Sequence, residues 1–302
     1  MIHRYQKKGL NFVLDVNSGA VHLLDDISYA VSGLLDENMG DTCPQSIIDA
    51  LPDYTADEIR EAYDELYELL RHEREHGKIV WVMGPAFAFD HDARNAFSLL
   101  VAGGYVHALL AGNALATHDL EAAYLKTTLG QNIYTQQSQP NGHYNHLDTI
   151  NAINTYGSIP AFIEQNGIRD GIMHACVAHG VPYVLAGSIR DDGPLPGVYG
   201  DVYAAQNAMR ELVQQATTVI CVATQLHTIS TGNMPPSYCV RGGRVRPVYL
   251  YCVDVSEFVT NKLRDRGSLS SVPIVANAQD FLCRVAAGLG LPVAEKYDKI
   301  NR

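Results

Sequence analysis

The chain has 302 residues, of which 47% are hydrophobic, enough for one large domain, or for one domain plus a small one. Its formal net charge is −11, and no cluster of Lys and Arg offsets it, which excludes the basic surface of a nucleic-acid-binding protein. The sequence contains no run of about 18 apolar residues, the length needed to cross a membrane, and its first residues do not have the pattern of a signal peptide. A cytoplasmic protein with no nucleic-acid or membrane partner is therefore expected.

The six cysteines are scattered, with no CxxC or other metal-ligand spacing. They are Cys43, Cys176, Cys221, Cys239, Cys252 and Cys283. Cys221 and Cys252 fall inside apolar, strand-like runs, which indicates small buried side chains. All six are predicted to be reduced thiols, as is usual in the cytosol.

Residues 1–76 predict a small α+β module of winged-helix-like character. Strand-like runs at 11–16 and 20–25 flank the short turn Asn17-Ser18-Gly19, which indicates a hairpin. One amphipathic helix is expected at 25–35. A longer one follows Thr55, which stands three residues before Glu58, the spacing of a capping box. The module contains no constellation of catalytic groups.

The segment HRYQKKGLNFVLDVNSGAVHLLDDISYAV and the acidic helix after it resemble the amino-terminal segment of radical-SAM maturases that act on Cys-rich SCIFF peptides. In that family the segment is peptide-recognition-like. The resemblance therefore implies a peptide or partner protein as one candidate ligand of residues 1–76. The CxxxCxxC cluster motif is absent from the chain, which excludes radical-SAM chemistry.

From residue 77 onward, apolar strand-like runs alternate with helical segments. Strands are expected at 78–83, 105–110, 181–185, 218–223, 248–253 and 273–276. Helices are expected near 92–102, 142–156, 201–215, 256–266 and 277–288. Such alternation is typical of an α/β fold with a doubly wound parallel sheet. Residues 77–302 are therefore predicted to be a second domain.

The segment VPYVLAGSIRDDGPLP, residues 181–196, is the most informative part of the sequence, because an apolar run is followed directly by a charged turn. A buried strand ends at Gly187-Ser188, and the neighbouring carboxylates of Asp191 and Asp192 follow in a turn rich in Gly and Pro. Two adjacent carboxylates repel one another, so they favour a place where an ammonium, a hydroxyl or backbone amides satisfy them. The alternative is a solvated β-turn.

Every expected strand ends in a polar residue or a glycine, and these ends line one edge of a parallel sheet, where such folds bind ligands. The converging residues are Gly84, Asn113, Ser188, Thr224 and Asp254. Asp254 suits a ribose diol, or alternatively caps a helix before Ser256. No GxGxxG occurs, so a dinucleotide pyrophosphate would be held by other turns, such as Gly84-Pro85-Ala86 or Gly187-Ser188.

Residues 77 to about 290 resemble the carboxyl-terminal nucleotide-binding domain of the LOR/SDH family, which includes the archaeal-type ornithine cyclodeaminases. The matching segments are GKIVWVMGPA, GYVHALLAGNALATHDLEAAY, GIMHACVAHGVPYVLAGSIRDDGPLP, DVYAAQNAMRE, ATQLHTISTGNMPPS and CVDVSEFVTNKLRDRGS. The resemblance implies a deoxyhypusine-synthase-like NAD-binding fold.

Three departures from the family pattern accompany this resemblance. Family members carry a large amino-terminal domain, and here the small module of residues 1–76 stands in its place. Lys126 stands where the family usually has Gly, and Arg241-Gly242-Gly243-Arg244 is an insertion. Binding of NAD is therefore expected to carry over more safely than the cyclisation reaction.

The resemblance implies conversion of L-ornithine to L-proline and ammonia, with NAD retained as cofactor because the cycle is redox-neutral. Such a site needs a base and a carboxylate for a cationic amino-acid substrate. His118, beside Asp119, is the candidate base, because histidine titrates near neutral pH. Asp191 or Asp192 is expected to hold the substrate ammonium. The candidate cofactor-binding residues are Gly84, Pro85, Ala86, Gly112, Asn113, Gly187, Ser188, Thr224, His227, Gly232, Asn233 and Asp254.

Competing interpretations exist for the histidines. His118 and Asp119 could instead cap the helix that continues through Glu121. His143 and His146 have a metal-ligand spacing, but a third ligand is not evident, so no metal is expected. His174 and His179 are expected to be structural.

Two classes of function stay open on the sequence alone. One is an NAD-dependent lyase of the ornithine cyclodeaminase type, expected to be a homo-oligomer. The other is a non-catalytic NAD-binding sensor or scaffold with a peptide-binding amino-terminal module.

Overall fold

The computed structural model describes residues 2–7, 10–15, 20–24, 56–256 and 271–293. The turn predicted at 17–19, the helix predicted at 25–35, the Thr55 cap and Cys43 lie outside these residues. Nearly all of the helix predicted at 256–266 also lies outside them.

The amino-terminal strands form a three-stranded antiparallel sheet in the order β1-β2-β3. Its strands are β1 (Ile2–Lys7), β2 (Leu10–Asp15) and β3 (Ala20–Leu24). The pairing of β2 with β3, with Asp15 opposite Ala20, confirms the predicted hairpin, and β1 is an additional strand. The winged-helix-like character depends on residues outside the described part and stays a prediction.

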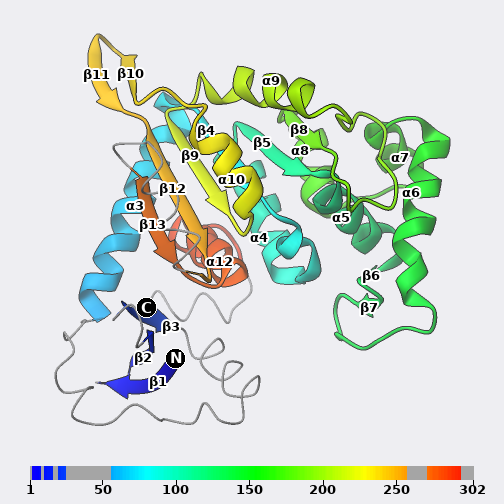
Figure 1. Ribbon diagram of the computed structural model, residues 1–302, viewed down its shortest axis with the longest axis horizontal. Helices are drawn as coiled ribbons and strands as arrows, with labels where there is room; N and C mark the ends of the chain where they lie inside the picture. Colours follow the sequence, from blue (N-terminus) through cyan, green and yellow to red (C-terminus); the bar gives the residue numbers. More distant parts are fainter. Residues whose placement is uncertain (1, 8–9, 16–19, 25–55, 257–270, 294–302) are drawn as a thin grey trace.

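A six-stranded sheet with every pairing parallel forms the centre of the structure, in the order β13-β12-β9-β4-β5-β8 (Figure 1). Its strands are β4 (Ile79–Met83), β5 (Ala108–Gly112), β8 (Tyr183–Ala186), β9 (Thr218–Val222), β12 (Tyr249–Asp254) and β13 (Ser271–Val275). All six overlap the predicted strands, so the prediction of a doubly wound parallel sheet is confirmed.

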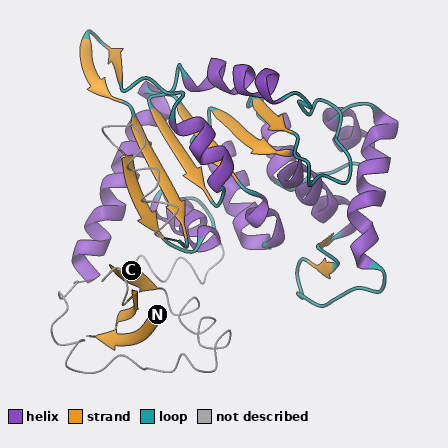
Figure 2. Ribbon diagram, viewed as in Figure 1, coloured by secondary structure: helices purple, strands orange, loops and turns teal. Residues whose placement is uncertain are grey.

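Helices cover both faces of this sheet (Figure 2). The described helices are α3 (Ala56–His76), α4 (His91–Ala102), α5 (Asn113–Leu125), α6 (Asn145–Tyr156), α7 (Ile159–Gln165), α8 (Ile172–Ala178), α9 (Val202–Val213), α10 (Gln225–Gly232) and α12 (Ala278–Gly288), with the 3-10 turns η1 (Pro85–Phe89) and η2 (Gly142–Tyr144); α6 packs on α5 and α7 rather than on the sheet. Trp81 of β4 packs in the larger core cluster, whereas Val80 and Val82 pack in the second cluster beside Met209 of α9. Because both faces are covered, β4 is continuously apolar.

Strand β5 begins three residues later than predicted, at Ala108 rather than Tyr105. The backbone at Tyr105 is occupied by other partners: the Trp81 indole donates to its carbonyl at 3.0 Å, and its amide donates to the carbonyl of Leu100 at 2.9 Å. Tyr105 is apolar and buried, so its sequence pattern is that of a strand, although its backbone pairs elsewhere.

The strand order reverses between β4 and β9. The chain passes from β4 through β5 to β8 on one side, and then resumes at β9 on the other side of β4. At such a reversal the connections diverge and leave a crevice outside the carboxyl ends of the strands. The ends of β4 and β9, at Gly84 and Ala223, are therefore the expected ligand position, which we call the crevice.

The carboxyl half of α3 packs in the same core as the sheet. Leu66, Tyr67 and Leu70 belong to the larger cluster, and the Tyr67 hydroxyl donates to the carbonyl of Arg284 in α12 at 3.3 Å. A Cβ added to Gly288 would meet the Tyr67 ring, so the close approach of α3 to α12 requires glycine there. The proposed boundary near residue 77 stays a prediction.

The insertion Arg241-Gly242-Gly243-Arg244 forms the tip of a protruding hairpin. Strands β10 (Tyr238–Arg241) and β11 (Arg244–Pro247) pair antiparallel around Gly242 and Gly243, whose φ angles are 57° and 76°. Two central residues with positive φ are typical of the turn that matches the twist of a two-residue hairpin, and glycine adopts it at little cost.

Glu73 ties α3 to this hairpin. Its fully buried carboxylate accepts bonds from both terminal nitrogens of Arg246, at 2.6 and 3.0 Å, and from the Thr217 hydroxyl. Burial alone would raise the pKa of Glu73, but the hydrogen bonds from Arg246, Thr217 and His72 outweigh it and lower the pKa to about 2. The charged form of Glu73 is therefore stabilised by folding.

We expect this carboxylate to make stability depend on pH in the acid range. Because its pKa is depressed from 4.5, its contribution is complete above about pH 4.5 and is lost as the pH falls toward about 2. The loss should be on the order of 3 kcal/mol. Urea unfolding at several pH values should show a weaker dependence in Glu73→Gln. Glu68→Gln, which removes an exposed partner of Arg71, should behave like wild type.

The five described cysteines are free thiols: Cys176, Cys221, Cys239, Cys252 and Cys283. The prediction of reduced cysteines is confirmed for these five. Burial raises the pKa of Cys176 to about 12, which makes it unreactive. Among the described helices, none has the length and apolar character needed to cross a membrane.

Candidate active site

The carboxyl ends of β4 and β9 approach each other closely at the reversal of strand order. The amide of Gly84 donates to the carbonyl of Val222 at 3.0 Å, and a Cβ on Gly84 would lie 1.9 Å from the carbonyl oxygen of Ala223. Only glycine fits here, and Ala223 itself has a φ of 53°. The predicted turn Gly84-Pro85-Ala86 thus opens η1 directly at the crevice.

His227 lines the other side of this crevice. Its ring lies 3.6 Å from the position of a Cβ on Gly112, so it reaches from the start of α10 to the end of β5. Burial lowers the pKa of His227, and the charge of Asp191 opposes that shift. Its Nδ1 is buried and has no hydrogen-bond partner among the described residues. An unpartnered buried ring nitrogen is costly and fits a site where a ligand supplies the partner.

Asn113 positions the acidic turn rather than facing the crevice. Its side chain is buried, donates to the carbonyl of Gly193 at 2.9 Å and accepts from the amide of Leu195 at 3.0 Å. Both ends of the amide are therefore occupied by backbone. Asn113 thereby fixes the loop after β8 against the start of α5.

Within that loop, the carboxylate of Asp191 closes the turn that begins at Ser188. Oδ2 of Asp191 accepts from the amide of Ser188 at 2.8 Å, and Gly187 donates to the carbonyl of Tyr199 at 2.9 Å. Asp192 is 60% exposed at its side chain, and its Oδ2 lies 2.9 Å from Nε2 of His146. The two neighbouring carboxylates therefore have different environments.

The remaining candidate cofactor residues separate into two groups. Thr224 precedes α10 at the crevice. Asp254 ends β12, and its Oδ1 accepts from the amide of Ser256 at 3.0 Å, as a capping residue would. Gly232 and Asn233, however, end α10, about 12 Å along its axis from Thr224. The structure does not bring these two together with the strand ends.

His118 lies on α5 and is backed by a buried carboxylate. Its Nδ1 is 3.0 Å from Oε2 of Glu121, whose side chain is 1% exposed. The other oxygen of Glu121 accepts from the Thr127 hydroxyl at 2.9 Å. The His118 ring packs against Phe89 of η1, with ring centroids 5.3 Å apart. The His146 ring, whose partner Asp192 follows β8, lies 6.1 Å from the His118 ring between centroids, so His118 lies near the loops that follow β4 and β8, inside the helix rather than at its cap.

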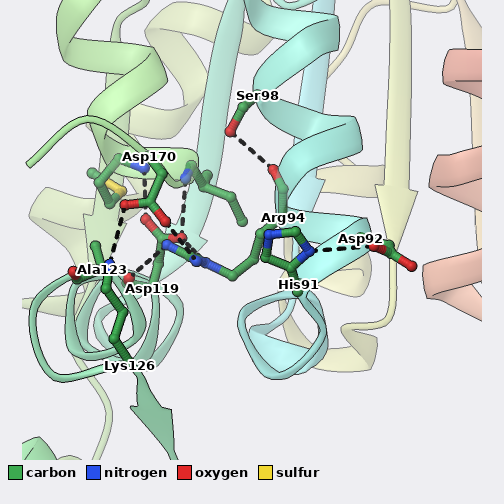
Figure 3. Close-up of polar contacts among 10 residues, drawn as sticks. His91, Asp92, Arg94, Ser98, Asp119, Ala123, Lys126 and Asp170 are labelled. Atoms are coloured by element: carbon green, nitrogen blue, oxygen red, sulfur yellow. Dashed lines mark hydrogen bonds and ion pairs between the residues drawn. The ribbon is translucent and has the colours of Figure 1, made fainter. Parts of the chain in front are cut away.

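Asp119, one residue further on, points into the protein and has a structural position (Figure 3). Its fully buried carboxylate accepts from Nε of Arg94 at 2.8 Å and from the amides of Ile172 and Met173 at 3.0 and 2.8 Å. It therefore neutralises a buried guanidinium and caps α8. Both oxygens of the Asp119 carboxylate therefore have partners within the protein.

The backbone conformation of Lys126 explains why the family usually has Gly at this position. It ends α5 in the left-handed region, with a φ of 61°, a conformation that glycine adopts without strain. The lysine donates to the carbonyl of Ala123 at 2.8 Å and lies 3.8 Å from Asp170 (Figure 3).

Two polar residues of this site are missing from the sequence-based candidates. Glu121 stands three residues after His118 on a helix, where side chains meet, so this spacing could have identified it. His146 was considered only as a metal ligand, and its partner Asp192 is 46 residues away, so no local pattern connects them. Among the described residues, no group of three or more His, Cys, Asp or Glu side chains is arranged to hold a metal ion.

The family described as arginine dihydrolase ArgZ-like, C-terminal, Rossmann fold matches residues 64–285. The chain belongs to this family. The match agrees with the six-stranded parallel sheet and with the resemblance of residues 77–290 to LOR/SDH proteins. It gives no support to the resemblance of residues 1–76 to radical-SAM maturases.

Relatives of this ArgZ-like domain include enzymes of amino-acid metabolism. The chain is 45% identical to an ornithine cyclodeaminase of Methanocaldococcus jannaschii over 226 residues, which cover 74% of this chain and 51% of the relative. It is 42% identical to the bifunctional arginine dihydrolase/ornithine cyclodeaminase ArgZ of Synechocystis sp. over 206 residues, 68% of this chain and 28% of that protein. The chain spans about half the length of the archaeal relatives it matches.

Solved structures give the same fold. An LOR/SDH protein from Methanococcus maripaludis superposes with a TM-score of 0.70 at 38% identity, covering 76% of this chain and 69% of that one. The ternary complex of AgrE with ornithine and NAD+ superposes with a TM-score of 0.68 at 33% identity, covering 83% and 34%.

Proposed function

We propose that the protein is an NAD-dependent lyase of the ornithine cyclodeaminase type, which converts L-ornithine to L-proline and ammonia. Relatives 42–45% identical to this chain carry that activity in their names, and a related structure holds both ornithine and NAD+. The observation that carries the proposal is the Glu121-backed imidazole of His118 beside the crevice at the reversal of strand order. A cofactor crevice and an acid–base group thus belong to the same domain.

The residues at the crevice fit NAD. Gly84 and Gly112 keep the ends of β4 and β5 free of side chains. Nδ1 of His227 is buried without a hydrogen-bond partner among the described residues, so a bound nucleotide could supply one. Leu226 and Val255, exposed apolar residues that follow β9 and β12, suit the face of a base. We propose that NAD binds here, with the Asp254 carboxylate on a ribose hydroxyl.

This placement predicts discrimination between NAD and NADP. A carboxylate beside the ribose repels a 2′-phosphate, a juxtaposition that costs several kcal/mol, so NADP should bind on the order of 100-fold more weakly. Calorimetry should show that difference in wild type and a smaller one in Asp254→Ser. Equal affinity of wild type for both nucleotides would contradict the role of Asp254.

When bound, NAD supplies oxidation of the amino-bearing carbon and its later reduction. The chain itself supplies binding and proton transfer. Because a carboxylate only accepts hydrogen bonds, Glu121 fixes the proton of His118 on Nδ1 and leaves Nε2 to accept a proton from a substrate ammonium. Asp191 and Asp192 add negative charge beside the site, which favours the cationic chain of ornithine.

Ammonia release from L-ornithine by the purified protein with NAD tests the proposal. We expect ammonia and proline in equal amounts, with no net formation of NADH. If the protein binds NAD but forms no proline from ornithine, the enzyme proposal fails. A non-catalytic NAD-binding sensor then becomes the better account.

Compartment and assembly complete the proposal. Five free thiols suit a reducing cytosol, so we propose a cytoplasmic protein. We further propose a homo-oligomer, and a peptide or partner protein as the ligand of residues 1–76. Light scattering of the purified chain would test the first of these two.

A further inference from the structure

Two histidines, each paired with a carboxylate, face one another beside the crevice. His118 comes from α5 and His146 from the start of α6, and their ring centroids are 6.1 Å apart. Glu121 holds Nδ1 of His118 at 3.0 Å, whereas Asp192 holds Nε2 of His146 at 2.9 Å. The two carboxylates thus bind different ring nitrogens, Nδ1 of His118 and Nε2 of His146. The other nitrogen of each ring can accept or donate a proton.

The two rings differ in their access to water. The His118 side chain is 15% exposed and its carboxylate 1%, whereas His146 is 24% exposed and its carboxylate 60%. The inner pair is braced further: the Thr127 hydroxyl, which donates to Glu121, accepts from the Asn145 amide at 2.8 Å. Asn145 precedes His146, so this hydrogen-bonded chain ties the start of α6, which carries His146, to the His118 ring.

The proposed reaction moves protons in both directions at two nitrogens. The α-ammonium of ornithine must lose a proton before its carbon gives up a hydride, and the side-chain ammonium must lose one before its nitrogen can form a bond to the oxidised α-carbon. The α-nitrogen must gain a proton before its bond to that carbon breaks and ammonia leaves. Ornithine carries two ammonium groups, while the products are zwitterionic proline and ammonium, so the overall reaction releases no proton. Each proton removed must therefore be given back.

We propose that His146 is the second acid–base group of this site, and that it donates the proton to the departing ammonia while His118 takes the proton from the attacking amine. This inference rests on the proposed function. Asp192 is then a positioning residue for His146 as well as a source of negative charge. The more exposed of the two rings serves the product that leaves for solvent.

Replacement of His146 by alanine tests the inference, with His143→Ala as the matched control. His143 lies three residues earlier, is exposed, and has its ring centroid 4.1 Å from that of Tyr144. His146→Ala should lower turnover by about 100- to 10,000-fold, and added imidazole should restore part of it. A purely structural role would not be rescued by imidazole. The His143→Ala variant should retain the wild-type turnover.

A second measurement does not depend on turnover. Ornithine should slow the modification of His118 and His146 by diethyl pyrocarbonate, read by peptide mass spectrometry, while His143 reacts as before. Retained turnover in His146→Ala, a loss without rescue, or no protection of His146 in an active wild type overturns the inference and leaves the proposed function intact. A wild type that releases no ammonia overturns the proposed function and this inference with it.

Discussion

Replacing Asp119 with asparagine is expected to lower the free energy of unfolding by about 3–5 kcal/mol, because it leaves the buried guanidinium of Arg94 without its counter-charge. Arg94 is 2% exposed and Asp119 is not exposed at all, so water cannot compensate. For a domain of this size the melting temperature should fall by about 6–20 °C. Calorimetry or circular dichroism would measure this change.

Asp170→Asn is the matched control for this prediction. Asp170 lies 3.5 Å from the same guanidinium, but its side chain is 44% exposed (Figure 3). Its loss should cost about 0–1 kcal/mol, as for other surface ion pairs. Equal melting temperatures of Asp119→Asn and wild type would contradict the structural role. Turnover per folded molecule should change little in Asp119→Asn, because both carboxylate oxygens are bonded to Arg94 and to the amides that begin α8.

The different roles of His118 and Asp119 illustrate what sequence reasoning can reach. Neighbouring residues on a helix point about 100° apart, so His118 turns toward Phe89 of η1 and Asp119 toward α8. A carboxylate that directly follows a histidine in a helical sequence is therefore not the hydrogen-bond partner that helix geometry predicts for that histidine. The partner, Glu121, lies one turn further on, where helical geometry brings side chains together.

The sheet was predictable because its determinants are local. A strand buried on both faces must be apolar throughout, and the run of β4, IVWVM, has that pattern. Its boundary with the preceding loop was predictable in the same way. The start of β5 was not, because Tyr105 is apolar and buried, yet its backbone carbonyl binds the Trp81 indole instead of a strand.

The candidate site was predictable only in part, since its connections run between distant segments. The ends of β5 and β8 could be expected at one edge of the sheet. That Asn113 holds the loop of Gly193 and Leu195, across 80 residues, has no trace in local spacing. The same holds for His146, which reaches Asp192 only because α6 packs on α5.

Replacing His118 with alanine is expected to lower turnover by about 100- to 10,000-fold, the usual contribution of an acid–base residue. NAD affinity should stay nearly unchanged, because the ring contacts Phe89 rather than the strand ends. Initial rates of proline formation and calorimetric titration with NAD would measure the two effects separately. His179→Ala, on the exposed end of α8, is the control and should match wild type in both.

Glu121→Gln separates the position of the His118 ring from its protonation. Glutamine has the same shape, and its oxygen can still accept from the Thr127 hydroxyl, but its NH2 group would then face Nδ1 of His118. That donor favours the tautomer with the proton on Nε2, which cannot accept a proton from the substrate. The variant should therefore lose most of its turnover while its ring stays in place. If Glu121→Gln kept wild-type turnover while His118→Ala lost it, the Glu121 carboxylate would not be the group that sets the tautomer of His118.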